Sequence, residues 1–230
     1  TLAQLKNDLV ATVSHELKTP IASIRILVET LLNESKSDPE KLKDYLVLID
    51  NENKRLGLLV HKFLAFSKME RSENYFEMES VDPKEIGKDV LQAFEERFDS
   101  STYSLTVCCQ NSYSQPLLGD RDALVTALSN LLENAYKYGG IGKQIRFGCV
   151  QNESSTCFEV SDNGEGISKK EQKRIFEQFY QPDRRLNKHK GGVGLGLSIV
   201  SLIVKKHRGK VEIESEVGEG CCFRIVIPNA

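Results

Sequence analysis

The segment VSHELKTP, residues 13–20, places a histidine beside groups that could help it act as a nucleophile. A neutral imidazole is a competent nucleophile, and a neighbouring carboxylate such as Glu16 can accept the proton from its second ring nitrogen. Thr19 lies one turn beyond His15 on the same face of a helix. Pro20 has no N–H to donate to the carbonyl of Glu16, so one backbone hydrogen bond of the helix is missing beside the histidine. A lone exposed histidine is usually an ordinary surface residue, and these neighbours favour chemistry at this one.

A second polar group lies within NLLENAYKYGG, residues 130–140, which has the spacing of a helix. Asn130 and Asn134 are one turn apart, so two amide oxygens project from one face and could ligate a hard cation such as Mg²⁺. Lys137 lies one turn beyond Asn134, where its ammonium could meet a phosphate. The alternative is that these are ordinary surface residues of an amphipathic helix.

Two glycine clusters, DNGEG at residues 162–166 and GGVGLGL at residues 191–197, indicate backbone that approaches a ligand closely. Asp162 follows a strand and could accept a hydrogen bond, while Gly164 and Gly166 would let the chain pass near a flat ligand. D-N-G is also an ordinary turn sequence. The second cluster opens a helix, a geometry that directs backbone N–H groups at phosphate.

A Rossmann dinucleotide-binding turn is the main alternative for GGVGLGL. It fails on context, because the Rossmann turn follows the first strand of a parallel sheet. Here the glycines follow the charged segment PDRRLNKHK, residues 182–190. We interpret that basic segment as a lid over a bound anion, with a solvated loop as the alternative.

The candidate nucleophile needs a helix that exposes it, and the N-terminal part of the chain has the right pattern. Apolar residues recur every three or four positions from Leu5 to Leu31, which predicts one long amphipathic helix. His15 lies about 160° from the centre of this apolar stripe and should therefore face water. The turn sequence NESKSDPE follows, with Asp38 as a candidate N-cap and Pro39 in the first turn of a second helix.

The second helix has a near-strict heptad stripe from Leu42 to Phe66 with one polar break at Glu52. Two helices alone cannot cover two apolar stripes of this length. We therefore predict that the hairpin pairs with a second copy in a homodimeric four-helix bundle. Packing of the stripes onto the following domain is the alternative, and the heptad spacing favours the symmetrical bundle.

From Tyr75 onward the apolar period changes and indicates an α/β sandwich, with one mixed sheet covered on one face by helices. Strands are expected in FEMESV, YSLTVCCQ, IRFGCVQ, TCFEVSD and the hairpin KVEIESEVGEGCCFRIVIP. Helices are expected from Pro83 to about Phe98 and in GDRDALVTALSNLLENAYKY, SKKEQKRIFEQF and LGLSIVSLIVKKH. We therefore expect a helical domain at residues 1–70, a linker at 71–80 and the sandwich domain at 81–230.

Composition and charge argue against several classes of function. The 230 residues carry 31 Lys and Arg against 33 Asp and Glu, so there is no electrostatic case for binding nucleic acid or an anionic membrane surface. No apolar run approaches the ~20 residues that span a bilayer, and the N-terminus lacks a signal-peptide pattern, so we expect a cytoplasmic location. The six cysteines include no C-x-x-C pair, and we interpret them as reduced apolar residues of strands.

Five segments occur in an order that resembles the sensor histidine kinases of two-component systems. VSHELKTP resembles the H-box, NLLENAYKY the N-box, DNGEG the G1 box, FEQFY at residues 176–180 the F-box, and GGVGLGL the G2 box. The resemblance covers essentially the whole chain. It implies a dimerisation and phosphoacceptor hairpin followed by a Bergerat-type ATP-binding domain, the fold shared with gyrase, mismatch-repair and chaperone ATPases.

By position, the resemblance makes His15 the phosphoacceptor, Glu16 its acid/base partner and Thr19 the residue that positions water to dephosphorylate a response regulator. It implies that Asn134, helped by Asn130, holds Mg²⁺. The other ATP-binding residues that it implies are Lys137 at phosphate, Tyr138 beside adenine, Asp162 at the adenine amine, Gly164 and Gly166 in the G1 loop, and Lys190, Gly192, Gly194, Leu195 and Gly196 in the lid and its phosphate-binding hinge. The Cys221–Cys222 pair departs from the family, which more often has small hydroxyl residues there for water-mediated contact with adenine.

The resemblance therefore implies an ATP-dependent histidine kinase that autophosphorylates His15 and passes the phosphoryl group to an aspartate of a response regulator. It also implies phosphatase activity toward that regulator and a membrane anchor in the full-length protein. Because nucleotide and acceptor lie on different domains, turnover requires the ATP-binding domain to swing onto the bundle, with Pro20 and MERSENYF as candidate bending points. A non-catalytic ATP-gated dimerisation module is the alternative. It predicts loss of His15, Asn134 or the glycines, all of which are present.

Overall fold

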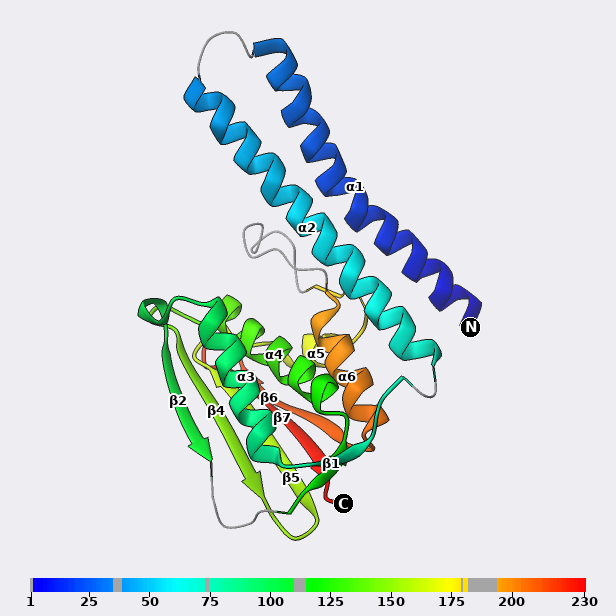
Figure 1. Ribbon diagram of the computed structural model, residues 1–230, viewed down its shortest axis with the longest axis vertical. Helices are drawn as coiled ribbons and strands as arrows, with labels where there is room; N and C mark the ends of the chain where they lie inside the picture. The colour runs from blue at the N-terminus through cyan, green and yellow to red at the C-terminus, as the bar shows by residue number, and fades with distance from the viewer. Residues whose placement is uncertain (1, 35–38, 73–74, 110–114, 179, 182–193) are drawn as a thin grey trace. The chain divides into compact units, whose positions relative to one another are not determined.

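The computed structural model describes residues 2–34, 39–72, 75–109, 115–178, 180–181 and 194–230 (Figure 1). It divides into two compact units, Thr1–Lys68 and Met69–Ala230. The first unit is helical, and the second combines a five-stranded sheet with helices. Among the described residues, every helix is too short or too polar to cross a bilayer.

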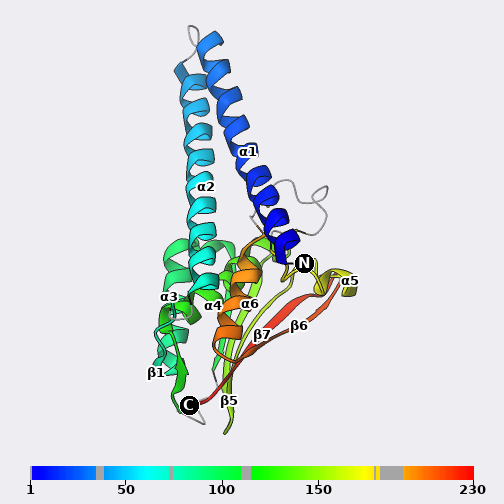
Figure 2. The ribbon, with the colours of Figure 1, turned by 90° about the vertical axis from the view of Figure 1, so that its right-hand side faces the viewer.

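The first unit is a hairpin of two long helices, α1 (Leu2–Glu34) and α2 (Pro39–Arg71), as the apolar periodicity predicts. Figures 1 and 2 show the two helices running side by side in opposite directions. Pro20 lies inside α1, which continues past it, so the missing N–H donor does not end the helix. The candidate N-cap Asp38 lies outside the described residues.

The second unit is built on a mixed sheet with the strand order β2-β4-β5-β7-β6. The strands are β2 (Ser104–Cys109), β4 (Gln144–Gln151), β5 (Ser155–Asp162), β7 (Gly220–Pro228) and β6 (Lys210–Glu216). β2 and β4 are parallel, and the other neighbouring pairs are antiparallel. Figure 2 shows the helices α3 (Pro83–Arg97), α4 (Arg121–Tyr138) and α6 (Gly196–Lys206) on one face of this sheet. The predicted α/β sandwich is therefore confirmed.

The helix α4 is the centre of the core, and it packs against both α3 and α6. It carries leucines on one face that are almost completely buried, namely Leu124, Leu128, Leu131 and Leu132. The sheet contributes Phe147 and Phe158, which are also fully buried. Burial of a side chain of this size is worth about 1.5–3 kcal/mol, so this apolar layer holds α4 and its polar residues in place.

The first turn of α4 is capped by Asp120, whose Oδ1 accepts a hydrogen bond from the N–H of Ala123 at 2.9 Å. Its Oδ2 accepts a hydrogen bond from the N–H of Glu77, also at 2.9 Å. The N–H of Asp120 donates to Nε2 of His207 at 2.9 Å. One residue therefore joins the start of α4, the segment before β1 and the end of α6.

His207 is buried at the end of α6, where burial lowers the pKa of its imidazole. Its Nδ1 lies 2.7 Å from the carbonyl oxygen of Ile203, so Nδ1 carries the proton when Nε2 accepts from Asp120. The ring of Phe76 packs edge-on against the imidazole with centroids 5.7 Å apart. The two hydrogen-bonding partners of the neutral ring therefore both favour the tautomer with the proton on Nδ1.

A short strand pair lies outside the main sheet. β1 (Glu79–Val81) pairs antiparallel with β3 (Leu117–Gly119) in a separate two-stranded sheet. The sequence predicts β1 but not β3, because three residues carry too little periodicity to be recognised. A 3-10 turn, η1 (Ser100–Thr102), leads into β2 and is also not predicted.

The helix predicted over SKKEQKRIFEQF is much shorter than expected. The structure has only α5 (Lys169–Gln172), and turns follow it. Ser168 caps α5 as helix chemistry predicts. Beyond α5, Ile175 is buried and Phe176 packs edge-on against Phe223 with ring centroids 6.4 Å apart. These tertiary contacts override the helical propensity of the segment.

Candidate functional site

Asn130 and Gly196 come together where α4 packs against α6. Asn130 is buried, and its Nδ2 donates to the carbonyl of Thr126 at 2.8 Å. A Cβ built on Gly196 would lie only 3.2 Å from Oδ1 of Asn130. Glycine therefore lets the first residue of α6 approach the amide oxygen closely, so the segment that resembles the N-box lies against the segment that resembles the G2 box.

The C-terminal end of α4 lies against the DNGEG loop. Asn134, Lys137 and Tyr138 are all half-buried there, and Nζ of Lys137 lies 4.7 Å from the centroid of the Tyr138 ring. A Cβ on Gly164 would collide with the backbone carbonyl oxygen of Tyr138. The loop can therefore cross the end of α4 only with glycine at this position.

Asp162 ends β5 within this loop. Its Oδ1 accepts a hydrogen bond from the N–H of Gly164 at 2.8 Å, and the backbone N–H of Cys221 on β7 also bonds the carboxyl group. Burial raises the pKa of this carboxyl group, and the two N–H donors oppose that effect. A partly buried carboxylate that is oriented by backbone donors is suited to accept a hydrogen bond from a ligand amine.

Two residues that the sequence does not single out support the loop behind Asp162. The Oγ of Ser215 on β6 accepts from the N–H of Ile167 at 2.8 Å and donates to the carbonyl of Gly220 at 2.7 Å. Nε2 of Gln172 donates to the carbonyls of Ile167 and Ser215 at 2.7 and 2.9 Å. A polar residue on the buried face of a strand is the signal that could have found Ser215.

The thiol of Cys221 lies beside the same loop, 3.3 Å from Oγ of Ser215. Burial raises the pKa of this thiol to about 11, so it is protonated at neutral pH. The hydroxyl group that the family more often carries at this position is thus replaced by a thiol with a serine hydroxyl next to it.

The start of α6 lacks a side-chain cap among the residues that the structure describes. Gly194 has a φ of 70°, Leu195 is fully buried, and the helix begins at Gly196 without a side-chain cap. The carbonyl of Leu195 accepts bonds from Oγ of Ser198 and the N–H of Ile199, both at 2.9 Å, and these fix the turn. Uncapped N–H groups at a helix start can bind phosphate oxygens. The predicted lid with Lys190 and Gly192 lies outside the described residues.

The donor set fits Mg²⁺ held jointly by the protein and a nucleotide. Asn130 and Asn134 offer neutral amide oxygens one helical turn apart. In the part of the chain that the structure describes, no group of three or more His, Cys, Asp or Glu side chains could hold a metal ion. Mg²⁺ commonly uses one or two protein ligands together with substrate phosphates, so a small amide set is compatible with it.

His15, Glu16 and Thr19 lie on neighbouring turns of α1 in the first unit. The side chain of His15 is outside the described part of the structure, while Glu16 is half-buried and Thr19 is exposed. The structure therefore brings the candidate nucleotide-binding residues together in the second unit and carries the candidate acceptor residues in the first. This distribution is the one expected of an ATP-binding domain combined with a separate helical acceptor domain.

Comparison with known proteins identifies the same two parts. Residues 5–72 match the family model of the His Kinase A (phospho-acceptor) domain. Residues 119–230 match the model of the histidine kinase-, DNA gyrase B- and HSP90-like ATPases. The curated relative SenX3, a sensor-like histidine kinase of Mycolicibacterium smegmatis, is 32% identical over 97% of this chain and 58% of its own length. The chain belongs to the sensor histidine kinases and comprises their phosphoacceptor and ATP-binding domains.

Solved structures support the fold. The histidine kinase ThkA in complex with the response regulator TrrA superposes with a TM-score of 0.80 at 24% identity, covering 99% of this chain and 63% of that one. Full-length ShkA in complex with AMPPNP has a TM-score of 0.70 at 25% identity, covering 97% of this chain and 46% of that one. The arrangement of elements in each unit is therefore that of histidine kinases.

Proposed function

We propose that this chain transfers the γ-phosphoryl group of ATP to His15 and then to an aspartate of a response regulator. The convergence of Asn130 with Gly196 carries the proposal, because it joins a candidate metal ligand to a phosphate-binding helix start. The structures of ShkA with AMPPNP and of ThkA with TrrA support a nucleotide and a response regulator as the two partners.

The second unit would bind Mg-ATP along the face where α4, the DNGEG loop and α6 meet. Asp162 would accept a hydrogen bond from the adenine amine, because its carboxylate is oriented by two backbone donors. Asn134 and Asn130 would hold Mg²⁺, which neutralises charge on the phosphate oxygens when bound. Lys137 and the first N–H groups of α6 would contact the phosphates.

Phosphoryl transfer would follow an in-line displacement. The neutral imidazole of His15 would attack the γ-phosphorus, the bond from that phosphorus to the bridging oxygen would break, and ADP would leave. Glu16, next in the chain, would accept the proton from the second ring nitrogen, so positive charge would not accumulate on the phosphorylated ring. The phosphoryl group would then pass from His15 to a carboxylate oxygen of the regulator.

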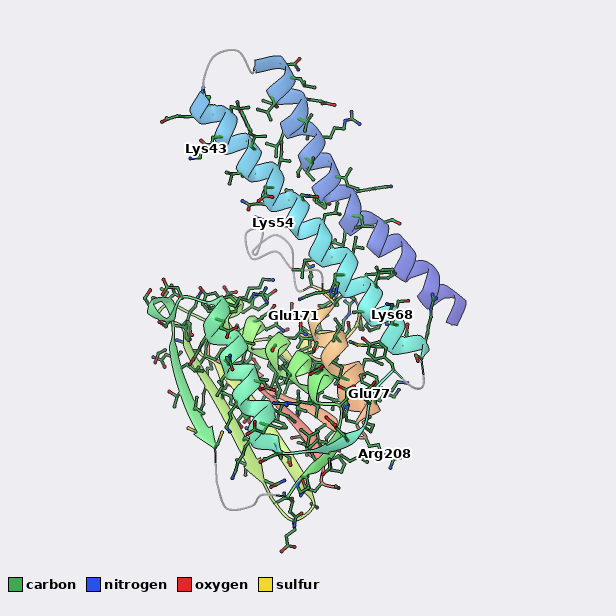
Figure 3. All side chains as sticks on the ribbon, in the orientation of Figure 1. Lys43, Lys54, Lys68, Glu77, Glu171 and Arg208 are labelled. Atoms are coloured by element: carbon green, nitrogen blue, oxygen red, sulfur yellow. The ribbon has the colours of Figure 1, made fainter. Side chains whose placement is uncertain are left out.

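We also propose that the hairpin forms a homodimeric four-helix bundle. Both helices expose large apolar side chains to water, namely Ile21, Ile26, Val28 and Leu32 on α1 and Leu42, Leu46, Val47, Leu48, Leu58, Val60 and Leu64 on α2. Figure 3 shows side chains along α2 and along the C-terminal half of α1. An apolar surface of this extent favours association with a second copy.

Phosphatase activity toward the response regulator is a second proposed function. Thr19 is exposed on α1, one turn after His15, where its hydroxyl could position water beside a phosphorylated regulator. Release of phosphate from the phosphorylated regulator should fall in Thr19→Ala while autophosphorylation persists. Equal phosphatase rates in the two proteins would remove Thr19 from this role.

Incubation with γ-labelled ATP tests the kinase directly. We expect label that is acid-labile and base-stable, that disappears in His15→Gln, and that falls at least 100-fold in Asn134→Ala, by analogy with other charge-stabilising groups. ATP binding without labelling would favour the non-catalytic dimerisation module instead. We further propose that the chain is the cytoplasmic part of a longer, membrane-anchored sensor, which fractionation of the full-length protein would check.

A further inference from the structure

Two cysteines meet at the edge of the main sheet. Cys109 is the last residue of β2, the strand at one end of the strand order, and its register partner on β4 is Cys149. Neighbouring strands lie about 4.8 Å apart, which is within the Cα separation of about 4.4–6.8 Å that a disulfide spans. The parallel pairing of β2 with β4 therefore places the two residues within bridging distance.

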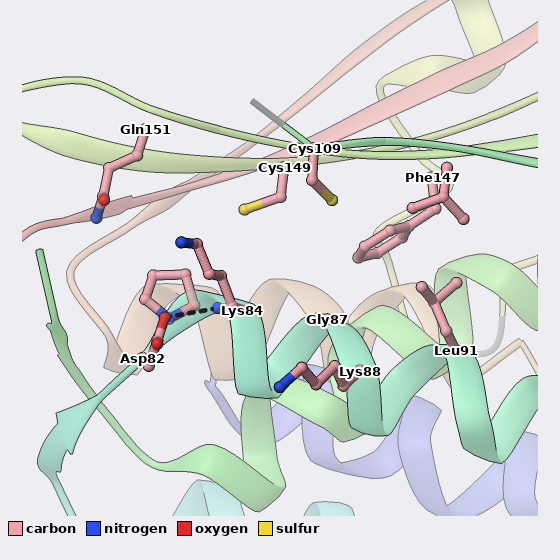
Figure 4. Close-up of a pocket in the computed structure, with 11 residues that line it drawn as sticks. Asp82, Lys84, Gly87, Lys88, Leu91, Cys109, Phe147, Cys149 and Gln151 are labelled. Carbon is pink, nitrogen blue, oxygen red and sulfur yellow. Dashed lines mark hydrogen bonds between the residues drawn. The ribbon is translucent and has the colours of Figure 1, made fainter. Parts of the chain in front are cut away.

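The side chains of both cysteines lie on the face of the sheet that α3 covers. They line a pocket of about 260 Å³ between α3 and the two strands, together with Leu91 and Phe147 (Figure 4). Figure 4 shows both thiols projecting from the strands toward α3, with their sulfur atoms turned to opposite sides. The backbone N–H of Cys149 bonds the sulfur of Cys109, so that sulfur lies against its partner residue. Rotation about the two Cα–Cβ bonds, into the space of the pocket, would bring the sulfur atoms together.

The other four cysteines are placed differently, and all six lie in the described part of the chain. Cys108 points to the opposite face of the sheet from its neighbour on β2, because successive residues of a strand alternate. Cys157 on β5 is the register partner of Val150, so it also faces away from the pocket. Cys108 and Cys157 lie on strands separated by β4, about 9–10 Å apart, which is too far for a disulfide. Cys221 and Cys222 on β7 have Asp, Ser or Glu as register partners on both sides.

The two thiols at the sheet edge differ in their access to solvent. Cys109 is exposed, whereas Cys149 is buried. Burial of the sulfur raises the pKa of both thiols, that of Cys149 to about 12. Both are therefore protonated at neutral pH, and the reactive thiolate is a small fraction of each. A small oxidant would meet Cys109 first, in a reaction that is slow at neutral pH and faster in alkali.

From this placement we infer that Cys109 and Cys149 form a reversible disulfide, which makes the sheet edge a redox modification site separate from the nucleotide-binding residues. With a peroxide as the oxidant, the sulfur of Cys109 attacks one oxygen and the O–O bond breaks, which gives a sulfenic acid and one water. The sulfur of Cys149 then attacks the sulfenic sulfur, the S–S bond forms and a second water leaves. Two thiols thereby lose two electrons and two protons, and one peroxide becomes two waters. A dithiol reverses the step by exchange.

Counting the free thiols of the whole chain before and after treatment with equimolar hydrogen peroxide tests the inference. The count, measured after unfolding, should fall from six to four. Dithiothreitol should restore all six, because a disulfide is reducible and sulfinic or sulfonic acids are not. The rate should rise about tenfold from pH 7 to pH 8, since the thiolate fraction rises by that factor below the pKa. The product should migrate as a single chain on a non-reducing gel. A count that stays at six, a loss that dithiothreitol does not reverse, or cross-linked chains would each overturn the inference.

Substitutions of single cysteines assign the pair. Cys109→Ser is the main test, because the residue is exposed and the fold should accept the change. Its count should stay at five under peroxide. Cys108→Ser and Cys157→Ser are matched controls on the opposite face of the sheet, and each should still fall from five to three. Cys149→Ala should also stay at five, with circular dichroism to verify that the variant folds. Loss of two thiols in Cys109→Ser, or protection of all five in Cys108→Ser, would show that other cysteines react.

Discussion

The two units differ in how far their large apolar side chains are buried. In the ATP-binding unit, Phe147, Phe158 and Ile203 are completely buried between the sheet and the helices. In the hairpin, Leu32 is 78% exposed and Leu46 is 53% exposed. The ATP-binding unit therefore contains its own core, whereas the hairpin exposes large apolar side chains, as expected if the proposed homodimer forms.

Among the variants considered, truncation of a core side chain in the ATP-binding unit should have the largest effect, which is a loss of folding stability. Phe158→Ala should lower the free energy of unfolding of the ATP-binding unit by about 3–5 kcal/mol, because the ring is fully buried. Urea unfolding followed by circular dichroism measures the loss. Val150→Ala on the neighbouring strand is exposed and should cost less than about 0.5 kcal/mol. Equal costs for the two variants would contradict a self-contained core.

A charge introduced into the apolar stripe of α1 should weaken association of the hairpin with a second copy and leave the stability of the second unit unchanged. Val28→Asp should raise the dissociation constant of the proposed homodimer by about 10- to 100-fold, because a carboxylate that becomes buried in the interface would lack a partner. Sedimentation equilibrium measures the change. Asn33→Asp adds the same charge at an exposed polar site of α1 and should have little effect. A dimer that is insensitive to Val28→Asp would show that α1 contributes another surface.

Acid should weaken the second unit through His207. Its folded pKa is lowered, mainly by burial, so the neutral ring contributes stability above the unfolded value of about 6.5, and this contribution is lost as pH falls toward the folded pKa. Protonation of Nε2 would also remove the acceptor for the N–H of Asp120, although the nearby Asp120 carboxylate moderates the loss. The urea concentration at the midpoint of unfolding should therefore be lower at pH 5 than at pH 7. His207→Gln should be less stable at pH 8 and show a shallower decline, and parallel curves would exclude His207 as the cause.

The smallest effect is expected at Cys221, within the ATP-binding unit. Cys221→Ser should change the KM for ATP less than about threefold, because the hydroxyl of Ser215 already lies beside the thiol. Autophosphorylation rates at several ATP concentrations measure the change. Ser215→Ala should raise KM more, because it also removes bonds to Ile167 and Gly220. The reverse order would mean that position 221 contacts the nucleotide more directly.

The sequence predicts the fold best where one pattern continues over many residues. The long stripes of α1 and α2 and the alternating burial of β5 have direct periodic signals. The three-residue strand β3 has no such signal, because its pairing with β1 is a long-range contact. The end of α5 is likewise set by Phe176 packing on Phe223, which local propensity does not contain.

The same limit applies to the site. The motif positions of Asn130, Asp162 and the glycines can be found in the sequence because each motif is local. Ser215 and Gln172 escape detection, because their importance depends on bonds between β6, α5 and the DNGEG loop. Residues that support a loop from a strand distant in sequence can be recognised only when the pairing of the strands is known.

Asp120 has a consequence for how disturbances spread through the ATP-binding unit. Its two carboxylate oxygens hold different segments, the backbone of Glu77 and the first turn of α4. A displacement of the backbone at Glu77 therefore pulls on the anchor of the same helix that carries Asn130 and Asn134, over a path of two hydrogen bonds. In mechanical terms, Asp120 is a rigid link between the backbone at Glu77 and the helix that carries the candidate Mg²⁺ ligands.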